Sequence, residues 1–303
     1  MTALLNPFAR PGRWFRGVFH CHTTNSDGMR SVESAMAWYA ERGYDFVSIT
    51  DHNQLTPVPR RRKDGPLAVP GTEVDVGQSR LGTSYHLVGI GLREMIGLPR
   101  EVAVRHGLAP QAVVRALRQA GAAVFVAHPY WSGLIVDDLL ALDGVAGIEV
   151  FNANTEVDIG KGYSGVHWDD CLSRGKLLFG AANDDAHWRL EDFGQAWTLV
   201  RAEALTPESV VEGLQSGAFY ASTGAVLEDV MFNGASVTVR VGAPGASEVR
   251  FKCDHRWGQR VVAGEKPLET ATYALRGHEK YVRVEVTTPS GQRAWTNPLF
   301  LER

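Results

Sequence analysis

Side chains of the types that bind metal ions are spread over the first two-thirds of the chain. They are nine imidazole and carboxylate groups in six short segments: His20, His22, Asp27, His52, Glu73, His86, His128, Asp185 and His187. Most of these segments begin as an apolar run and end in the polar group, as FVAHPY does around His128. Nine such groups exceed the needs of one ion and suit two or three metal ions of the hydrolytic kind.

The spacing inside the first segment, FHCHTTNSDG, favours shared binding of an ion. His20 and His22 are two residues apart, so on a strand both imidazoles lie on one face while Cys21 points the other way. The turn TTNSDG can then bring Asp27 back towards the pair. A His-x-His pair alone indicates little. The ordered series of TDH, a strand-end Glu, AHP and DDAH that follows is not expected by chance.

Short apolar runs and amphipathic stretches alternate over about the first 225 residues, and these are the elements that must position the polar groups. DFVSITDH and AAVFVAHP are typical of buried strands, while SVESAMAWYAERG and TPESVVEGLQSG are typical of capped helices. This alternation predicts an α/β fold with a mainly parallel sheet, open or closed into a barrel. In both arrangements chemistry gathers at the carboxyl ends of strands, where most of the polar groups fall.

The pattern changes near residue 225. Short alternating segments such as SVTVRV, EVRFKC and KYVRVEV are separated by Gly and Pro turns. They predict a small antiparallel β-sandwich at 226–303, next to a first domain at 1–225. We expect the second domain to pack as a flange that covers the first. A module that binds sugar or protein and a dimerisation surface are the alternatives.

The composition limits the classes of molecule that the protein is expected to bind. The chain has 303 residues, 44% of them hydrophobic, and a net charge of −3, which indicates no general nucleic-acid or membrane partner. No apolar run reaches the length of a membrane span, and the first residues do not resemble a secretory signal. Three widely spaced cysteines favour a reducing compartment, so we expect a cytoplasmic protein. The sequence does not determine the oligomeric state.

One basic run, RRRK at residues 60–63, departs from this balance. It lies between prolines in a loop that leaves directly from His52. A solvated loop is the expected interpretation, and a rim that attracts phosphate is the alternative.

The motifs HxHxxxxDG, TDH, strand-end Glu, AHP and DDAH, in this order, resemble the PHP family, named for polymerase and histidinol phosphatase. The resemblance covers roughly residues 15–225. It implies a distorted (β/α)7 barrel with a trinuclear metal site. It assigns one ion to His20, His22, Glu73 and Asp185, a second to Glu73, His86 and His128, and a third to Asp27, His52 and His187.

The ligand types leave the metal open. Nitrogen and oxygen ligands without thiolate suit Zn, Mn or Fe almost equally, so two to three divalent ions of these kinds are expected. Asp51 and Asp184 are expected to orient imidazoles by accepting their ring N–H, and Asp184 could exchange roles with Asp185. Glu149 and Asn152, in GIEVFN at another strand end, are candidates for contacting substrate or orienting ligands.

The implied activity is metal-dependent hydrolysis of a small-molecule ester. The favoured reaction is that of a phosphoesterase cleaving a phosphate mono- or diester with a hydroxide that bridges the ions, with Glu73, Asp185 and His187 as catalytic residues. The DDAH ending, GIEVFN and AWTNPLFL resemble the CehA/McbA-like subgroup. A CehA-like hydrolase of carboxylic esters or carbamates is therefore the first alternative. A non-catalytic PHP accessory module is the second.

Overall fold

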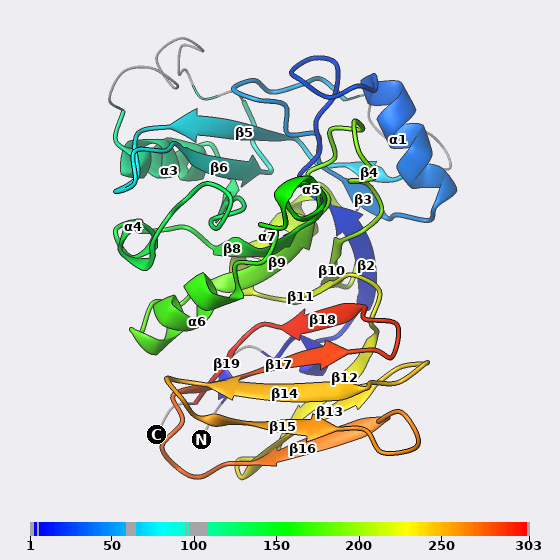
Figure 1. Cartoon of the computed structure of the whole chain (residues 1–303). Coiled ribbons are helices and arrows are strands. Elements are labelled where there is room, and N and C mark those ends of the chain that lie inside the picture. Colours follow the sequence, from blue (N-terminus) through cyan, green and yellow to red (C-terminus); the bar gives the residue numbers. More distant parts are fainter. Residues whose placement is uncertain (1–2, 5, 59–64, 95, 97–107, 302–303) are drawn as a thin grey trace.

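The computed structural model describes residues 3–4, 6–58, 65–94, 96 and 108–301. The basic run at 60–63 lies outside the described residues, so both of its interpretations stay predictions. In the described part the strands form three sheets, of eleven, five and three strands (Figure 1). No described helix is both long and apolar enough to cross a lipid bilayer.

The five-stranded sheet has the order β5-β6-β7-β8-β9. Its strands are β5 (Gly71–Val76), β6 (Tyr85–Ile90), β7 (Ala123–Val126), β8 (Gly147–Asn152) and β9 (Phe179–Asn183). The last three run parallel, as strand–helix alternation predicts. β6, however, is antiparallel to both β5 and β7. The short segment 77–84 between β5 and β6 explains the first reversal, because a direct hairpin connection makes two strands antiparallel. The sheet is therefore mixed and not mainly parallel.

The eleven-stranded sheet follows the order β1-β19-β17-β18-β11-β10-β2-β3-β4, with β14 beside β17 and β15 beside β14. Its N-terminal part comprises β1 (Ala3–Leu4), β2 (Arg13–Val18), β3 (Phe46–Val47), β4 (Leu67–Ala68), β10 (Trp197–Ala202) and β11 (Phe219–Ser222). Strands β2, β3 and β4 run parallel, whereas β10 is antiparallel to both β2 and β11.

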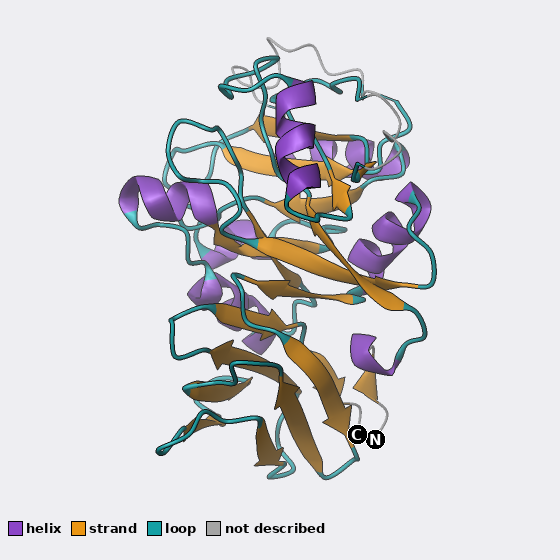
Figure 2. Cartoon of the chain, turned by 90° about the vertical axis from the view of Figure 1, so that its right-hand side faces the viewer, coloured by secondary structure: helices purple, strands orange, loops and turns teal. Residues whose placement is uncertain are grey.

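Helices lie around these strands in Figure 2. The described helices are η1 (Pro7–Ala9), α1 (Val32–Glu41), α3 (Pro110–Gln119), α4 (Val136–Leu140), α5 (Ala153–Ile159), α6 (Gly165–Ser173) and α7 (Pro207–Ser216). The predicted caps are confirmed: Ser31 Oγ accepts from Ser34 N at 3.3 Å, and Thr206 Oγ1 accepts from Ser209 N at 3.1 Å. Gly217 ends α7 in the left-handed region at φ 72°, where a Cβ would also meet the Phe179 ring.

The two N-terminal sheets do not close into a hydrogen-bonded barrel in the described residues. They meet instead through isolated bridges, which pair His52 with Glu73 and Cys21 with Ala186. The bridging residues His52, Cys21 and Ala186 lie in the segments that follow β3, β2 and β9, and these segments carry predicted ligands. The α/β class is thus confirmed, while a closed (β/α)7 barrel is not what the strand pairing shows.

The C-terminal strands are antiparallel, as predicted. They are β12 (Leu227–Phe232), β13 (Ser236–Val241), β14 (Glu248–Cys253), β15 (Gly258–Val262), β16 (Thr270–Ala274), β17 (Tyr281–Thr287), β18 (Arg293–Thr296) and β19 (Leu299–Leu301). The sheet β12-β13-β16 shares an apolar cluster with β14 and β17 that includes Val237, Phe251 and Val284. Main-chain pairing of β18 with β11 nevertheless runs across the predicted boundary at 225/226. The division into two domains stays a prediction.

Candidate metal centre

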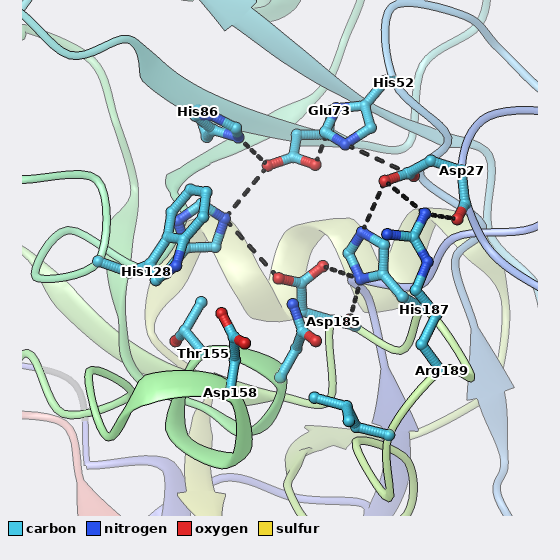
Figure 3. Close-up of a pocket in the computed structure, with 13 residues that line it drawn as sticks. Asp27, His52, Glu73, His86, His128, Thr155, Asp158, Asp185, His187 and Arg189 are labelled. Carbon is cyan, nitrogen blue, oxygen red and sulfur yellow. Dashed lines mark hydrogen bonds and ion pairs between the residues drawn. The ribbon is translucent and has the colours of Figure 1, made fainter.

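Seven of the nine predicted ligands line one cavity of 410 Å³ (Figure 3). The other two, His20 and His22, are fully buried and contact Glu73 and Asp185 of this lining. Glu73 and His86 project from β5 and β6, and His128 follows the end of β7. His20 and His22 come after β2, and Asp185 and His187 come after β9. The remaining cavity lining includes Trp131, Asn154, Thr155, Asp158, Arg189 and Leu190. The expected convergence of the side chains therefore holds, although the strands belong to two sheets. The expected strand-end position is wrong for Glu73, which lies inside β5, and His86 likewise lies within β6.

The backbone is left-handed at several of these strand ends. His128 has φ 27°, Asp185 has φ 54°, and Asn53, next to His52, also has φ 54°. Residues other than glycine rarely adopt this region, and such conformations persist where the surrounding structure determines them. These bends turn His128 and Asp185 out of their ladders and towards the cavity.

Four buried atoms form the most compact group. The Nε2 atoms of His20 and His22 are 3.2 Å apart. Each lies 3.0 Å from Asp185 Oδ1 and 3.1–3.2 Å from Glu73 Oε2. Asp185 Oδ1 has no hydrogen-bond partner of good geometry among the described residues. Converging lone pairs and an orphaned carboxylate oxygen fit a divalent cation, and these are the residues that the resemblance assigns to the first ion.

A second group gathers around Asp27, at the outer side of His22. His187 Nε2 lies 3.2 Å from Asp27 Oδ2, and His52 Nε2 lies 3.7 Å from Asp27 Oδ1. His22 joins this group through its other ring nitrogen, since Nδ1 lies 3.6 Å from Asp27 Oδ1. Asp27, His52, His187 and His22 can together hold a cation. This group contains the three residues assigned to the third ion, with His22 as an addition.

Glu73 faces two groups with its two oxygens. Oε2 points to His20 and His22, whereas Oε1 lies 2.9 Å from His86 Nδ1 and 3.4 Å from His128 Nε2. A carboxylate whose two oxygens face different sets of imidazoles is suited to bridge two ions. Burial would raise the pKa of Glu73, but the surrounding imidazoles of His20, His52 and His86 hold it well below its usual range.

Asp75 is a member of the site that the sequence analysis missed. Its Oδ1 lies 3.1 Å from His52 Nδ1 and 3.2 Å from His86 Nδ1, and His52, Glu73, Asp75 and His86 form a third possible cation group. Asp75 is two residues after Glu73 in PGTEVDV, so strand periodicity alone places both carboxylates on one face. This two-residue spacing was the sequence feature from which Asp75 could have been predicted as a site residue.

Glu149 and Asn152 support the ligands from β8. Glu149 is fully buried, and its Oε1 lies 2.8 Å from His20 Nδ1, while Oε2 accepts from the backbone N–H of His128 at 3.0 Å. Asn152 Nδ2 donates to Glu149 Oε2 at 2.7 Å and to Asp185 Oδ2 at 3.2 Å. Glu149 thereby directs the Nε2 atom of His20 towards the first group.

Asp51 and Asp184 do not orient imidazoles, contrary to expectation. Asp51 accepts from Thr23 N and Thr23 Oγ1, both at 2.7 Å, and so holds the loop that carries Asp27. Asp184 accepts from Tyr39 Oη at 2.9 Å and from the backbone N–H groups of residues 194–196, and burial raises its pKa to about 6. Each residue directly precedes a predicted ligand in sequence, so its side chain turns to the other side of the chain.

The carboxylates dominate the electrostatics of the cavity. Burial would lower the pKa of His52, but Glu73, Asp75 and Asp27 raise it to about 10. Asp185 and Asp27 likewise overcome burial and raise the pKa of His187 to about 9. In the absence of a cation, the negative charges therefore retain protons on imidazoles. A bound cation would replace those protons.

Comparison with known proteins identifies a solved structure with a similar fold. No family model and no curated protein sequence matches the chain. A two-domain protein from Bacteroides vulgatus, containing a predicted PHP-like metal-dependent phosphoesterase, superposes with a TM-score of 0.52. It is 19% identical, and the match covers 97% of this chain and 98% of that one. The chain therefore shares the fold of this two-domain protein over nearly its whole length.

Two further solved structures match a smaller part. A provisionally named metal-dependent phosphoesterase from Bifidobacterium adolescentis is 16% identical, with a TM-score of 0.42. An amidohydrolase from Chromobacterium violaceum is 17% identical, with a TM-score of 0.41. Each match covers 56% of this chain and 87% of the other protein.

Proposed function

We propose that the protein is a metal-dependent hydrolase that cleaves a small phosphate mono- or diester. The observation that carries this proposal is a group of four buried ligand atoms from His20, His22, Glu73 and Asp185. The two imidazole Nε2 atoms lie 3.2 Å from each other and 3.0–3.2 Å from one oxygen of each carboxylate. A buried Asp185 oxygen without a hydrogen bond is costly unless a cation compensates its charge.

The site residues take three kinds of role in this proposal. All nine predicted ligands hold two or three divalent ions, of Zn, Mn or Fe, with Glu73 as the bridge. Such ions, when bound, make a water molecule more acidic and polarise the ester. Asp185 and His187, with Glu73, position the ions next to the open cavity, and Glu149 fixes the ring of His20.

Charge at the cavity rim supports an anionic substrate. Arg189 lines the cavity, and its side chain is 54% exposed. Its Nη2 lies 3.6 Å from Asp27 Oδ2, so the guanidinium stands at the entrance beside the outer group. Nη2 of Arg189 donates to the backbone carbonyl of Asp27. The other N–H donors of the planar guanidinium suit phosphate oxygens, which favours a phosphate ester over a neutral carboxyl ester. A small-molecule substrate and residence in the cytoplasm belong to the same proposal.

Elemental analysis of purified protein, joined to an ester panel, tests this function. We expect two to three divalent ions per chain and hydrolysis of p-nitrophenyl phosphate or bis-p-nitrophenyl phosphate. Glu73→Gln should lower both metal content and turnover sharply, because it perturbs two groups at once. His255→Gln, at an exposed position in the turn between β14 and β15, is the control and should leave both unchanged.

The panel also separates the alternatives. Turnover of p-nitrophenyl acetate without turnover of the phosphate esters would favour the hydrolase of carboxylic esters or carbamates. A protein that binds no metal after Mn, Zn or Fe reconstitution and hydrolyses none of the esters would favour the non-catalytic module. Full activity in Glu73→Gln would contradict the bridging role.

A further inference from the structure

We propose that Asp75 is itself a metal ligand, and that it makes one ion position of this site selective for an oxygen-preferring cation such as Mn²⁺. The inference rests on the proposed metal-dependent function and adds a residue to it. Asp75 lies outside the ligand sets that the family resemblance implies for the three ions.

Strand pairing places Asp75 in the site. On β5 it follows Glu73 by two residues, so both carboxylates project from the same face of the strand. In the antiparallel pairing of β5 with β6, Asp75 lies directly opposite His86. Directly opposed residues have Cβ atoms about 5 Å apart, which brings a carboxylate and an imidazole into contact. The register, and not a flexible loop, therefore fixes this neighbour of His86.

One oxygen of Asp75 stands between two ring nitrogens. Asp75 Oδ1 lies 3.1 Å from His52 Nδ1 and 3.2 Å from His86 Nδ1. Glu73 completes the group, with Oε1 2.9 Å from His86 Nδ1 and Oε2 3.3 Å from His52 Nδ1. Two carboxylates and two imidazole nitrogens thus converge on one point at the edge of the cavity, where Asp75 is partly accessible.

With Asp75, this group offers two imidazoles and two carboxylates, the same ligand types as the compact group. A set of Glu73, His86 and His128 offers one carboxylate and two imidazoles, whereas Asp75 adds a second carboxylate. Carboxylate oxygens suit Mn²⁺ and Mg²⁺, whereas imidazole nitrogens suit Zn²⁺ and Fe²⁺. An additional negative charge also strengthens the attraction for any divalent ion in a low-dielectric site. Asp75 therefore shifts this position towards Mn²⁺.

A hydrogen-bonding role for Asp75 gives a different expectation and can be tested separately. If Asp75 only accepts hydrogen bonds from Nδ1–H of His52 and His86, asparagine can still accept them through its Oδ1. If Asp75 binds a cation, asparagine removes the charge and leaves a poor ligand. The isosteric substitution Asp75→Asn thus separates the two roles without changing side-chain volume.

The experiment titrates chelator-treated, full-length protein with Mn²⁺ alone and with Zn²⁺ alone, and counts bound ions per chain after equilibrium dialysis. We expect Asp75→Asn to bind one Mn²⁺ at least about tenfold more weakly than the unmodified protein, with a smaller change for Zn²⁺. Asp75→Glu, which retains a carboxylate, should restore part of the Mn²⁺ binding. Asp158→Asn is the matched control, because Asp158 lines the same cavity on α5 and belongs to none of the possible cation groups.

Equal Mn²⁺ affinity and stoichiometry in Asp75→Asn and the unmodified protein would overturn the inference and leave the proposed function intact. An equal loss in Asp75→Asn and Asp158→Asn would also overturn it, because the effect would then come from cavity charge in general. Failure of the unmodified protein to bind either ion would instead refute the proposed function, and this inference with it. Far-UV circular dichroism in chelator verifies that each variant is folded.

Discussion

Glu149 is the residue through which the body of the protein fixes the position of His20. Its two oxygens accept from His20, from the backbone of His128, and from Asn152 and Asn183. It is fully buried, so none of these donors can turn to water instead. A group of this kind determines which imidazole nitrogen remains free for an ion, although it need not touch the ion.

Glu149→Gln should lower the metal affinity of the site by about 10- to 100-fold, because an amide N–H₂ would replace one acceptor oxygen. Isothermal titration of the chelator-treated protein with Zn²⁺ measures this change. Glu156→Gln is the control, since that carboxylate accepts from Gly162 N at 3.0 Å and lies outside the possible cation groups. An unchanged affinity in Glu149→Gln would show that His20 needs no such partner.

At the scale of elements, a buried ion-pair network ties α6 to the C-terminal strands. Arg283 on β17 is fully buried and donates to Glu285 Oε1 at 2.7 Å and, through Nε, to Asp169 Oδ1 on α6 at 2.8 Å. Lys252 on β14 donates to Asp169 Oδ2 at 3.0 Å. Burial alone would lower the pKa of Arg283, but Glu285 and Asp169 raise it above its ordinary value.

Arg283→Met should reduce the free energy of unfolding by up to about 3–5 kcal/mol, because it leaves the buried carboxylate of Glu285 and the part-buried one of Asp169 with Lys252 as their one remaining cationic partner among the described residues. Arg240→Met is a control of the same chemistry. Its pair with Glu228 at 3.2 Å is about half exposed, and exposed pairs contribute about 0–1 kcal/mol. Urea unfolding of the three proteins measures both differences. Similar losses in the two variants would mean that the network does not hold α6 in place.

At the scale of the whole molecule, the C-terminal strands complete the N-terminal part instead of merely following it. Strand β18 pairs with β11, and fully buried Trp295 stacks on Phe151 of β8 at 5.9 Å between ring centroids. Asn297 Oδ1 accepts from Gly180 N at 2.9 Å, and its Nδ2 donates to the carbonyl groups of Gly217 and Phe219. These contacts favour the flange interpretation of 226–303.

Removal of residues 226–303 should therefore give an insoluble or unfolded protein, because β11 loses β18, one of its two partner strands, and buried backbone groups lose their hydrogen bonds to Asn297. Solubility and circular dichroism of the truncated chain measure this outcome. Asn297→Ala is a milder test and should cost on the order of 1–3 kcal/mol for each polar group left unpaired. A soluble truncation with full metal content would instead establish 1–225 as an independent domain.

The sequence by itself determined the α/β class and the set of residues that converge. Side chains on a strand alternate sides with a period of two, and apolar runs that contain or end in His, Asp or Glu place those groups on or just after strands whatever the sheet topology. The same local rule could have identified Asp75 from PGTEVDV. Capping at Ser31 and Thr206 is likewise local, since it depends on side chains three residues apart.

Only the tertiary structure decided which groups share a position. The direction of β6, the left-handed turns at His128 and Asp185, and the orientation of Asp51 and Asp184 depend on packing between distant segments. Their positions determine that Glu149 and Asp75, and not Asp51 and Asp184, contact imidazoles. Local sequence places a side chain on one face of a strand, whereas a distance of 3 Å between two strand ends is set by the whole fold.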